Sequence, residues 1–147
     1  MPVLAVPPVP ASAAQSSAEA AIVREINLVR RAHGLRGVRI SGGLARVAKA
    51  HSRKMLARNV LTHSSLDGSS FGSRLGRAGH RHRYGETLAW APDGSGTSAR
   101  VLVRLWMGSA PHRAVLMDGA LRRVGVGRVR GAMGAQRGAA ITADFSS

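Results

Sequence analysis

The period of the apolar residues changes along this chain, and that change limits the folds open to it. In the first two thirds, apolar side chains recur at helical spacing, which predicts helices near residues 18–33, 43–59 and 98–107. Toward the C-terminus, the runs "RVGVGRVRG" and "AAITADF" alternate as strands do, and the glycine-rich "GAMGAQRG" predicts a hairpin between them. Together with a strand in "GETLAW", this order predicts a layered α+β domain with a small, mainly antiparallel sheet.

Residues with capping chemistry mark the ends of these predicted helices. Ser17 and Thr97 are the expected N-caps of the first and third helices, and the second begins after Ser41. Gly34 ends the first helix, because glycine readily adopts the left-handed conformation that follows a helix. In the third helix, the residues expected to face inward are Val101, Leu102, Leu105 and Trp106.

Two glycines in the first C-terminal strand suggest an unusually close contact. Gly125 and Gly127 stand in the short run "GVG". They weaken the strand but permit another backbone to pack closely against it. No helix follows the run, so we do not interpret it as a dinucleotide-binding fingerprint.

Composition limits the partners of the chain. Its 147 residues suit one domain, and 22 basic against 7 acidic residues give a formal charge of +15, which favours anionic partners. The arginines are dispersed and aromatic residues are few, so sequence-specific nucleic-acid binding is not expected; contacts with an anionic polymer should weaken as salt is added. The absence of cysteine excludes disulfide and thiolate chemistry.

The N-terminal segment differs in composition from the rest. We expect residues 1–16 to be a disordered leader or the remnant of an export signal, because an apolar stretch precedes "ASA", which resembles a signal-peptidase site. Pro7, Pro8 and Pro10 interrupt any helix there. Residues 17–147 then form the domain, and no apolar stretch in the chain approaches the roughly 20 residues of a membrane span.

Three short polar segments supply the candidate site. They are "LTHSS" with His63, "YGETLAW" with Glu86, and "WMGSAPHR" with His112. Two imidazoles suit zinc or another divalent metal, so His63 and His112 are candidate ligands, with Glu86 as the hydrogen-bond acceptor behind them. The alternative is structural: Glu86, the only glutamate after residue 25, accepts hydrogen bonds that merely pin loops together.

The other histidines and the tryptophans have structural interpretations. His51 falls on the apolar side of the second predicted helix and is expected to be packed and hydrogen-bonded. His80 and His82 stand in an arginine-flanked turn and are expected to be solvated. Trp90 and Trp106 are expected to be core anchors.

The three polar segments and the predicted helices, in their order along the chain, resemble the CAP superfamily, also called the SCP domain. This superfamily includes cysteine-rich secretory, antigen-five and pathogenesis-related proteins. "EINLVRRAHGL" resembles its opening helix, "YGETLAW" its G-E-N-L-A pattern, and "WMGSAPHRAVLM" the bacterial W-x-x-S-P-x-H-R segment, over about Ala18 to Phe145. The resemblance implies a three-layer α-β-α sandwich whose cleft gathers two histidines and two acids. His63, Glu86 and His112 match three of those positions, and Ser109 stands at the fourth.

The resemblance and the residues together favour a binding protein over an enzyme. We expect a secreted or envelope-associated monomer whose cleft binds a ligand, a lipid or a surface and holds a divalent metal weakly. One alternative is a metal-dependent or serine hydrolase of envelope material, with Ser64, Ser65 or Ser109 as nucleophile. A second alternative is an electrostatic binder of an anionic envelope polymer.

Overall fold

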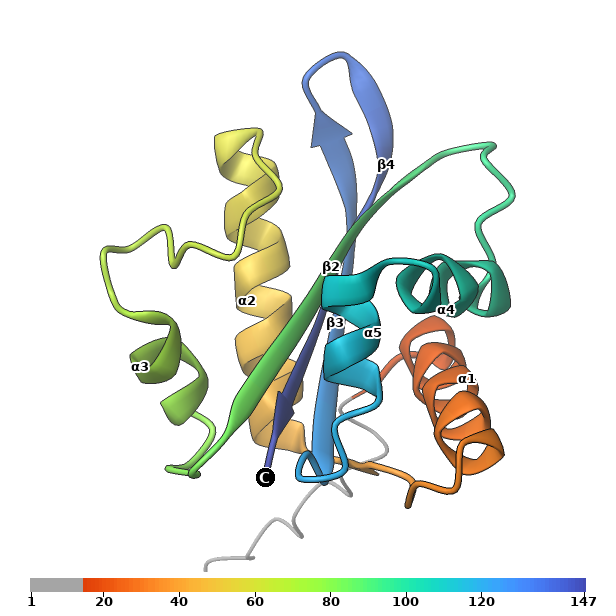
Figure 1. Cartoon of the computed structure of the whole chain (residues 1–147). Helices are drawn as coiled ribbons and strands as arrows, with labels where there is room; N and C mark the ends of the chain where they lie inside the picture. The colour runs from red at the N-terminus through yellow and green to blue at the C-terminus, as the bar shows by residue number, and fades with distance from the viewer. Residues whose placement is uncertain (1–14) are drawn as a thin grey trace, which may run out of the picture.

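Three layers make up the fold, with helices on both faces of a central sheet (Figure 1). The computed structural model describes residues 15–147, so nearly all of the predicted leader, residues 1–14, lies outside the described residues. The elements are α1 (Ser17–Ala32), β1 (Arg39–Ile40), α2 (Gly42–Arg58), α3 (Phe71–Gly76), β2 (Tyr84–Pro92), α4 (Ala99–Met107), α5 (Ala110–Leu116), β3 (Arg123–Met133) and β4 (Gln136–Ser146). The predicted α-β-α sandwich is confirmed.

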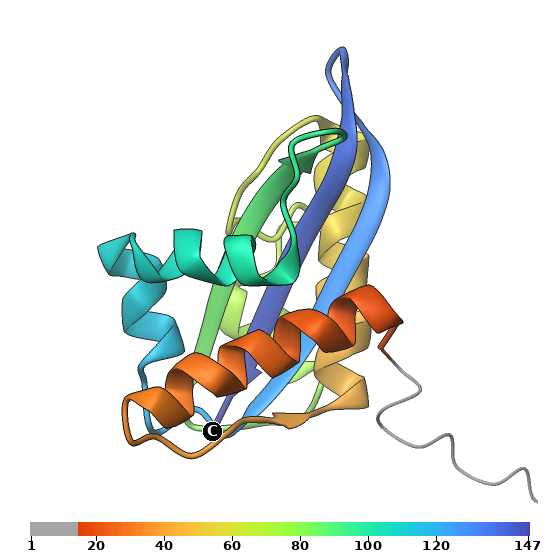
Figure 2. The ribbon, with the colours of Figure 1, turned by 90° about the vertical axis from the view of Figure 1, so that its right-hand side faces the viewer.

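The sheet has the strand order β1-β3-β4-β2. β4 pairs antiparallel with both β3 and β2, while the short β1 joins β3 in parallel, so the sheet is mainly antiparallel as predicted. Helices α1, α4 and α5 cover one face, and α2 and α3 cover the other (Figures 1 and 2). This order leaves β2 at an edge of the sheet, which matters for the site below.

The three predicted helices correspond to α1, α2 and α4. Three further elements, α3, α5 and β1, were not predicted; they have only 6, 7 and 2 residues. Elements this short do not complete enough turns or alternations to show a period. None of the helices in residues 15–147 combines the length and hydrophobicity that crossing a membrane needs.

Two of the predicted N-caps are wrong by one residue. Ser16, not Ser17, caps α1 through a capping box with Glu19, and Ser98, not Thr97, caps α4. In both cases the true cap is the serine whose hydroxyl accepts from the backbone N–H three residues later. Ser41 caps α2 as predicted.

Residues 15 and 16 belong to the folded part, although the sequence analysis placed them in the leader. The buried side chain of Gln15 donates to the Val126 carbonyl at 2.8 Å and accepts from the Val126 N–H at 2.7 Å. Gln15 therefore extends the hydrogen bonding of β3 through a side chain. Gln15 and Ser16 thus contact the domain that was expected to begin at residue 17.

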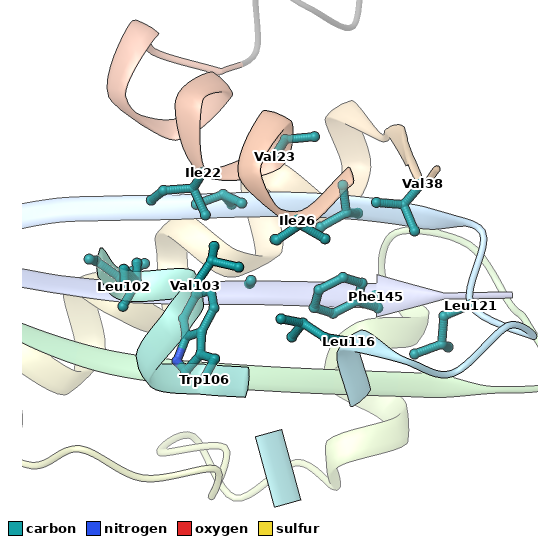
Figure 3. Packing of buried hydrophobic residues seen from close by; sticks show 14 of the residues in the cluster. Ile22, Val23, Ile26, Val38, Leu102, Val103, Trp106, Leu116, Leu121 and Phe145 are labelled. Atoms are coloured by element: carbon teal, nitrogen blue, oxygen red, sulfur yellow. The ribbon is translucent and has the colours of Figure 1, made fainter. Parts of the chain in front are cut away.

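The main core lies between the sheet and helices α1, α4 and α5 (Figure 3). Of the four α4 residues expected to face inward, Leu102 and Trp106 are buried, whereas Val101 is 40% exposed and Leu105 62% exposed. Val103 is buried instead. This helix is apolar on more than one side, so its sequence does not show which stripe meets the sheet.

Helix α2 packs directly onto the backbone of β3. A Cβ at Gly125 or Gly127 would collide with main-chain atoms of α2, which confirms the close contact predicted from "GVG". The Ser52 hydroxyl lies at the same contact, donating to the Gly127 carbonyl at 2.8 Å with Thr142 Oγ1 equally close. Helix α2 is thus fixed at one depth and rotation, which sets where the loop after it can lie.

A buried arginine holds together parts of the helical layer on the other face of the sheet, where α1 and α5 lie. Arg30 of α1 is fully buried, and its guanidinium donates to the carbonyls of Arg36, Leu116 and Leu121 at 2.8–3.0 Å. Leu116 is the last residue of α5. The bonds therefore hold the end of α5, and with it the helix that carries His112.

Candidate functional site

Glu86 lies on the edge strand β2, with its side chain directed to the face that α2 and α3 cover. Its side chain is only 1% exposed. The His63 Nδ1 atom lies 2.8 Å from Glu86 Oε1, and Arg74 donates from Nη1 to Oε2 at 2.6 Å and from Nη2 to Oε1 at 3.3 Å. The structure therefore joins two of the three predicted site residues and adds a third group, Arg74, that the sequence analysis missed.

Arg74 comes from the short helix α3 and is itself buried. Besides its bonds to Glu86, it donates to Ser65 Oγ at 2.8 Å and to the His63 carbonyl at 2.9 Å. One guanidinium thus fixes the loop between α2 and α3 against β2. Nothing in the sequence separates this arginine from the many exposed ones, because its six-residue helix shows no amphipathic pattern.

A second buried acid lies beside Glu86. Asp144 of β4 is directly opposite Glu86 in the antiparallel register and is fully buried. Among the described residues, no N–H group reaches either of its carboxyl oxygens. Burial, the hydrogen bond to Glu86 and the charge of Glu86 raise the pKa of Asp144 well above its ordinary value. Asp144 is therefore the member of the pair that favours the neutral, protonated form.

Glu86 is the ionised member of this pair. Burial alone would raise its pKa, but hydrogen bonds from His63, Asp144 and Arg74, with the Arg74 charge, lower it to about 2. An ionised carboxylate only accepts hydrogen bonds, so His63 Nδ1 must be the donor. In neutral His63, Nε2 is then the atom left with a lone pair, on a side chain that is 56% exposed.

His112 stands on α5, three residues after Ser109, the N-cap of that helix. Burial lowers the pKa of His112, and a positive charge on His63 would lower it further. Within residues 15–147, His112 makes no side-chain hydrogen bond. The structure thus brings His63 and Glu86 into direct contact and leaves His112 as an electrostatic neighbour.

An apolar cavity of about 300 Å³ adjoins His112. Trp90 and Trp106 lie in its wall, and its polar residues are Thr97, Ser109 and His112; the remaining lining residues are Leu88, Ala89, Leu102 and Leu105. Trp106 is a buried core anchor as expected. Trp90 is only partly buried and donates to Gln136 Oε1 at 2.9 Å, so for Trp90 that expectation holds only in part.

The hydrolase alternative depends on a serine beside a histidine. Ser65 is buried and bonded to Arg74 and to the Ser70 carbonyl, which makes it a structural residue. Neither Ser64 nor Ser109 has a side-chain hydrogen bond to an imidazole in the described part of the chain. No serine–histidine pair is therefore assembled there.

The remaining predicted histidines have structural positions. His51 is buried, and its Nε2 donates to the Thr62 carbonyl at 2.8 Å, while burial lowers its pKa. It is packed and hydrogen-bonded, as the sequence analysis expected. His80 and His82 are exposed.

The hydrogen bonds already made by these side chains limit which of them could bind a metal. Both Glu86 oxygens accept hydrogen bonds, so Glu86 fits the role of a partner behind His63 and not that of a ligand. Over residues 15–147 there is no group of three or more histidine, cysteine, aspartate or glutamate side chains arranged to hold a metal. His63 and His112 are thus the two ligands that the sequence proposes, and a metal site at them stays a prediction.

A model of the CAP family, described as the cysteine-rich secretory protein family, matches residues 23–143. No curated protein matches the chain in sequence. An outer surface protein from Borrelia burgdorferi is similar in structure, with a TM-score of 0.67, 20% identity, and coverage of 85% of this chain and 89% of that one.

Two further solved structures extend the similarity. An extracellular, SCP-domain protein from Bacillus anthracis has a TM-score of 0.72, 23% identity, and coverage of 97% of this chain but 45% of that one. A cysteine-rich secretory protein from Staphylococcus aureus has a TM-score of 0.65, 19% identity, and coverage of 87% and 38%. At these identities the similarity is one of fold, and this chain spans less than half of the latter two.

Proposed function

The chain belongs to the cysteine-rich secretory protein (CAP) family, and from that premise we propose that it is a secreted or envelope-associated binding protein for an amphiphilic ligand. The Borrelia and Bacillus structures are described as an outer surface and an extracellular protein, which supports this location. The name of the family does not apply to this chain literally, because it has no cysteine.

The observation that carries the proposal is the fixed, outward-facing imidazole of His63 together with the apolar cavity at His112. Glu86 and Arg74 hold His63 by its Nδ1 and its carbonyl, so Nε2 is free to bind a ligand. The cavity offers tryptophan and leucine surface for an acyl or similar chain. In the proposed complex, the apolar part of the ligand lies in the cavity and its polar head binds the histidines.

The same proposal includes a divalent metal that bridges the histidines and the head group of the ligand but is not required for binding. His63 and His112 would hold it, and it would supply a positive charge that binds an anionic head group. Two imidazole ligands predict weak metal binding, which weakens further as the pH falls because protons compete with the metal for the nitrogens. The carboxylate of Glu86 takes part by keeping the His63 ring in one orientation.

The two tryptophans provide the test, because both line the cavity and they are the only two in the chain. A brominated fatty acid quenches a tryptophan only on contact, so saturable quenching of the intrinsic fluorescence is expected. Leu105→Glu places a charge at the cavity and should abolish it. Leu28→Glu is the matched control, since Leu28 is similarly exposed, at 55%, but lies on α1.

Each outcome decides the proposal. The proposal is supported if Leu105→Glu removes the quenching and Leu28→Glu leaves it intact. The reverse pattern would place the ligand in the hollow between α1 and α4 that Leu28 lines, and would refute the proposal. For the metal, a zinc titration of the wild type should lose its signal in His63→Ala but not in His82→Ala, a change at another exposed histidine. Absence of saturable quenching with and without zinc would reject the binding function.

A further inference from the structure

A second cavity, of about 300 Å³, lies at the end of the sheet where α2 begins. Three arginines from three parts of the chain line it: Arg39 of β1, Arg81 from the loop before β2, and Arg123 at the start of β3. The other lining residues are Ile40, Ser41, Leu44, Ala78 and Ser146. It therefore contains three cations and two hydroxyl groups but no acidic side chain.

The register of the sheet forces two of these arginines together. Arg39 is the direct partner of Arg123, and Arg123 is the direct partner of Ser146. These residues form one row across β1, β3 and β4, so their side chains share a face. Like charges directly opposite each other in a sheet are destabilising.

The third arginine is placed by a tyrosine in the same row. Tyr84 is the partner of Ser146 on β2, and its hydroxyl accepts from the Arg81 N–H at 2.8 Å and donates to the Gly79 carbonyl. These two bonds shape the loop before β2. The loop thus holds Arg81 beside a row that already contains two positive charges.

No aspartate or glutamate side chain in residues 15–147 forms an ion pair with these arginines, and the ion pairs found there involve other basic residues. Among the described residues, the Arg81 guanidinium donates only to the His80 carbonyl, and the Arg123 guanidinium only to the main-chain oxygen of Ser147. Each guanidinium has five N–H donors, so most of those around the cavity have no acceptor in the part of the chain that the structure describes.

We infer that this cavity binds the phosphate group of a phosphate monoester. Guanidinium groups bind phosphate through paired hydrogen bonds, and a dianion with three terminal oxygens can engage three arginines, which the two oxygens of a carboxylate cannot. The cavity exceeds the size of a phosphate ion, which leaves room for the start of the esterified group. This site shares no residue with the His63 and His112 site, so it stands or falls independently of the function proposed above.

Calorimetric titration with glycerol 3-phosphate at constant ionic strength tests the inference. Arg39→Gln and Arg81→Gln should each weaken binding at least tenfold. Arg24→Gln is the matched control, because it removes the same charge from an exposed arginine on α1 outside the cavity. Glycerophosphocholine, a diester with one negative charge, should bind more weakly than the monoester.

Two further experiments test whether the phosphate belongs to a lipid and whether the arginines serve binding rather than stability. Vesicles with phosphatidic acid, compared with soluble glycerol 3-phosphate, distinguish a lipid monoester from a free one. In phosphate-free buffer, Arg39→Gln should melt at or above the wild-type temperature, since it relieves the repulsion with Arg123, yet it should lose the stabilisation that the monoester gives the wild type. Equal weakening in Arg24→Gln, or no saturable binding of any monoester, would overturn the inference.

Discussion

Replacing Arg74 with methionine should destabilise the domain far more than any replacement of an exposed arginine. The side chain of Arg74 is 2% exposed and that of its partner Glu86 is 1% exposed. Methionine fills much of the space but cannot donate, so the Glu86 carboxylate loses its compensating charge while it stays buried. Ser65 and the His63 carbonyl lose their donors as well.

The burial sets the expected size of the effect. Removing one partner of a buried ion pair costs about 3–5 kcal/mol, because the remaining charge is stranded in a medium of low polarity. For a domain of this length, 1 kcal/mol corresponds to a change of about 2–4 °C in melting temperature. The variant should therefore melt on the order of 10 °C below the wild type.

Urea unfolding and thermal melting at pH 7 measure the effect, and the adjoining sequence supplies the control. Arg77 also pairs with an acid, Asp67, but its side chain is 50% exposed. Exposed pairs contribute about 0–1 kcal/mol, so Arg77→Met should unfold within that range of the wild type.

The double variant Arg74→Met/Glu86→Gln tests the reasoning itself. If the stranded carboxylate causes the loss, removing its charge should recover a large part of the stability, which a double-mutant cycle measures. Equal stability of Arg74→Met and Arg77→Met would refute the argument, and so would a double variant no more stable than Arg74→Met alone.

Two other predictions concern the sheet. Gly127→Ala should lower the free energy of unfolding by about 3 kcal/mol or more, because the added Cβ meets the backbone of α2. Gly131→Ala on the same strand meets only the flexible end of Leu56 and should cost much less, so equal urea midpoints would contradict the prediction. Asp144→Asn should gain stability relative to the wild type as pH rises from about 4 to 8. The raised pKa of Asp144 makes the folded wild type hold a proton that the unfolded chain releases, whereas Asn still donates to Glu86 without one. A difference that is constant with pH would refute this assignment.

Several features of the fold were predictable because they depend on local sequence. Three helices and the C-terminal hairpin follow from apolar periods that continue for several turns or alternations. The close contact at Gly125 and Gly127 was also predictable, because glycine has few other uses inside a strand. The caps of α1 and α4 were wrong by one residue, since adjacent candidates such as Ser16 and Ser17 have the same chemistry until the helix start is known.

The candidate site, like the fold, could be predicted only in part from the sequence. The sequence by itself determined the family pattern and pointed to His63, Glu86 and His112, because each stands in a short segment with an unusual combination of residues. Only the tertiary structure brought in Arg74 and Asp144. Asp144 reaches Glu86 through the register of two strands far apart in the chain, and Arg74 does so through a helix too short to show a pattern. The charge states that fix His63 depend on burial and on distances between these groups, and neither is a property of local sequence.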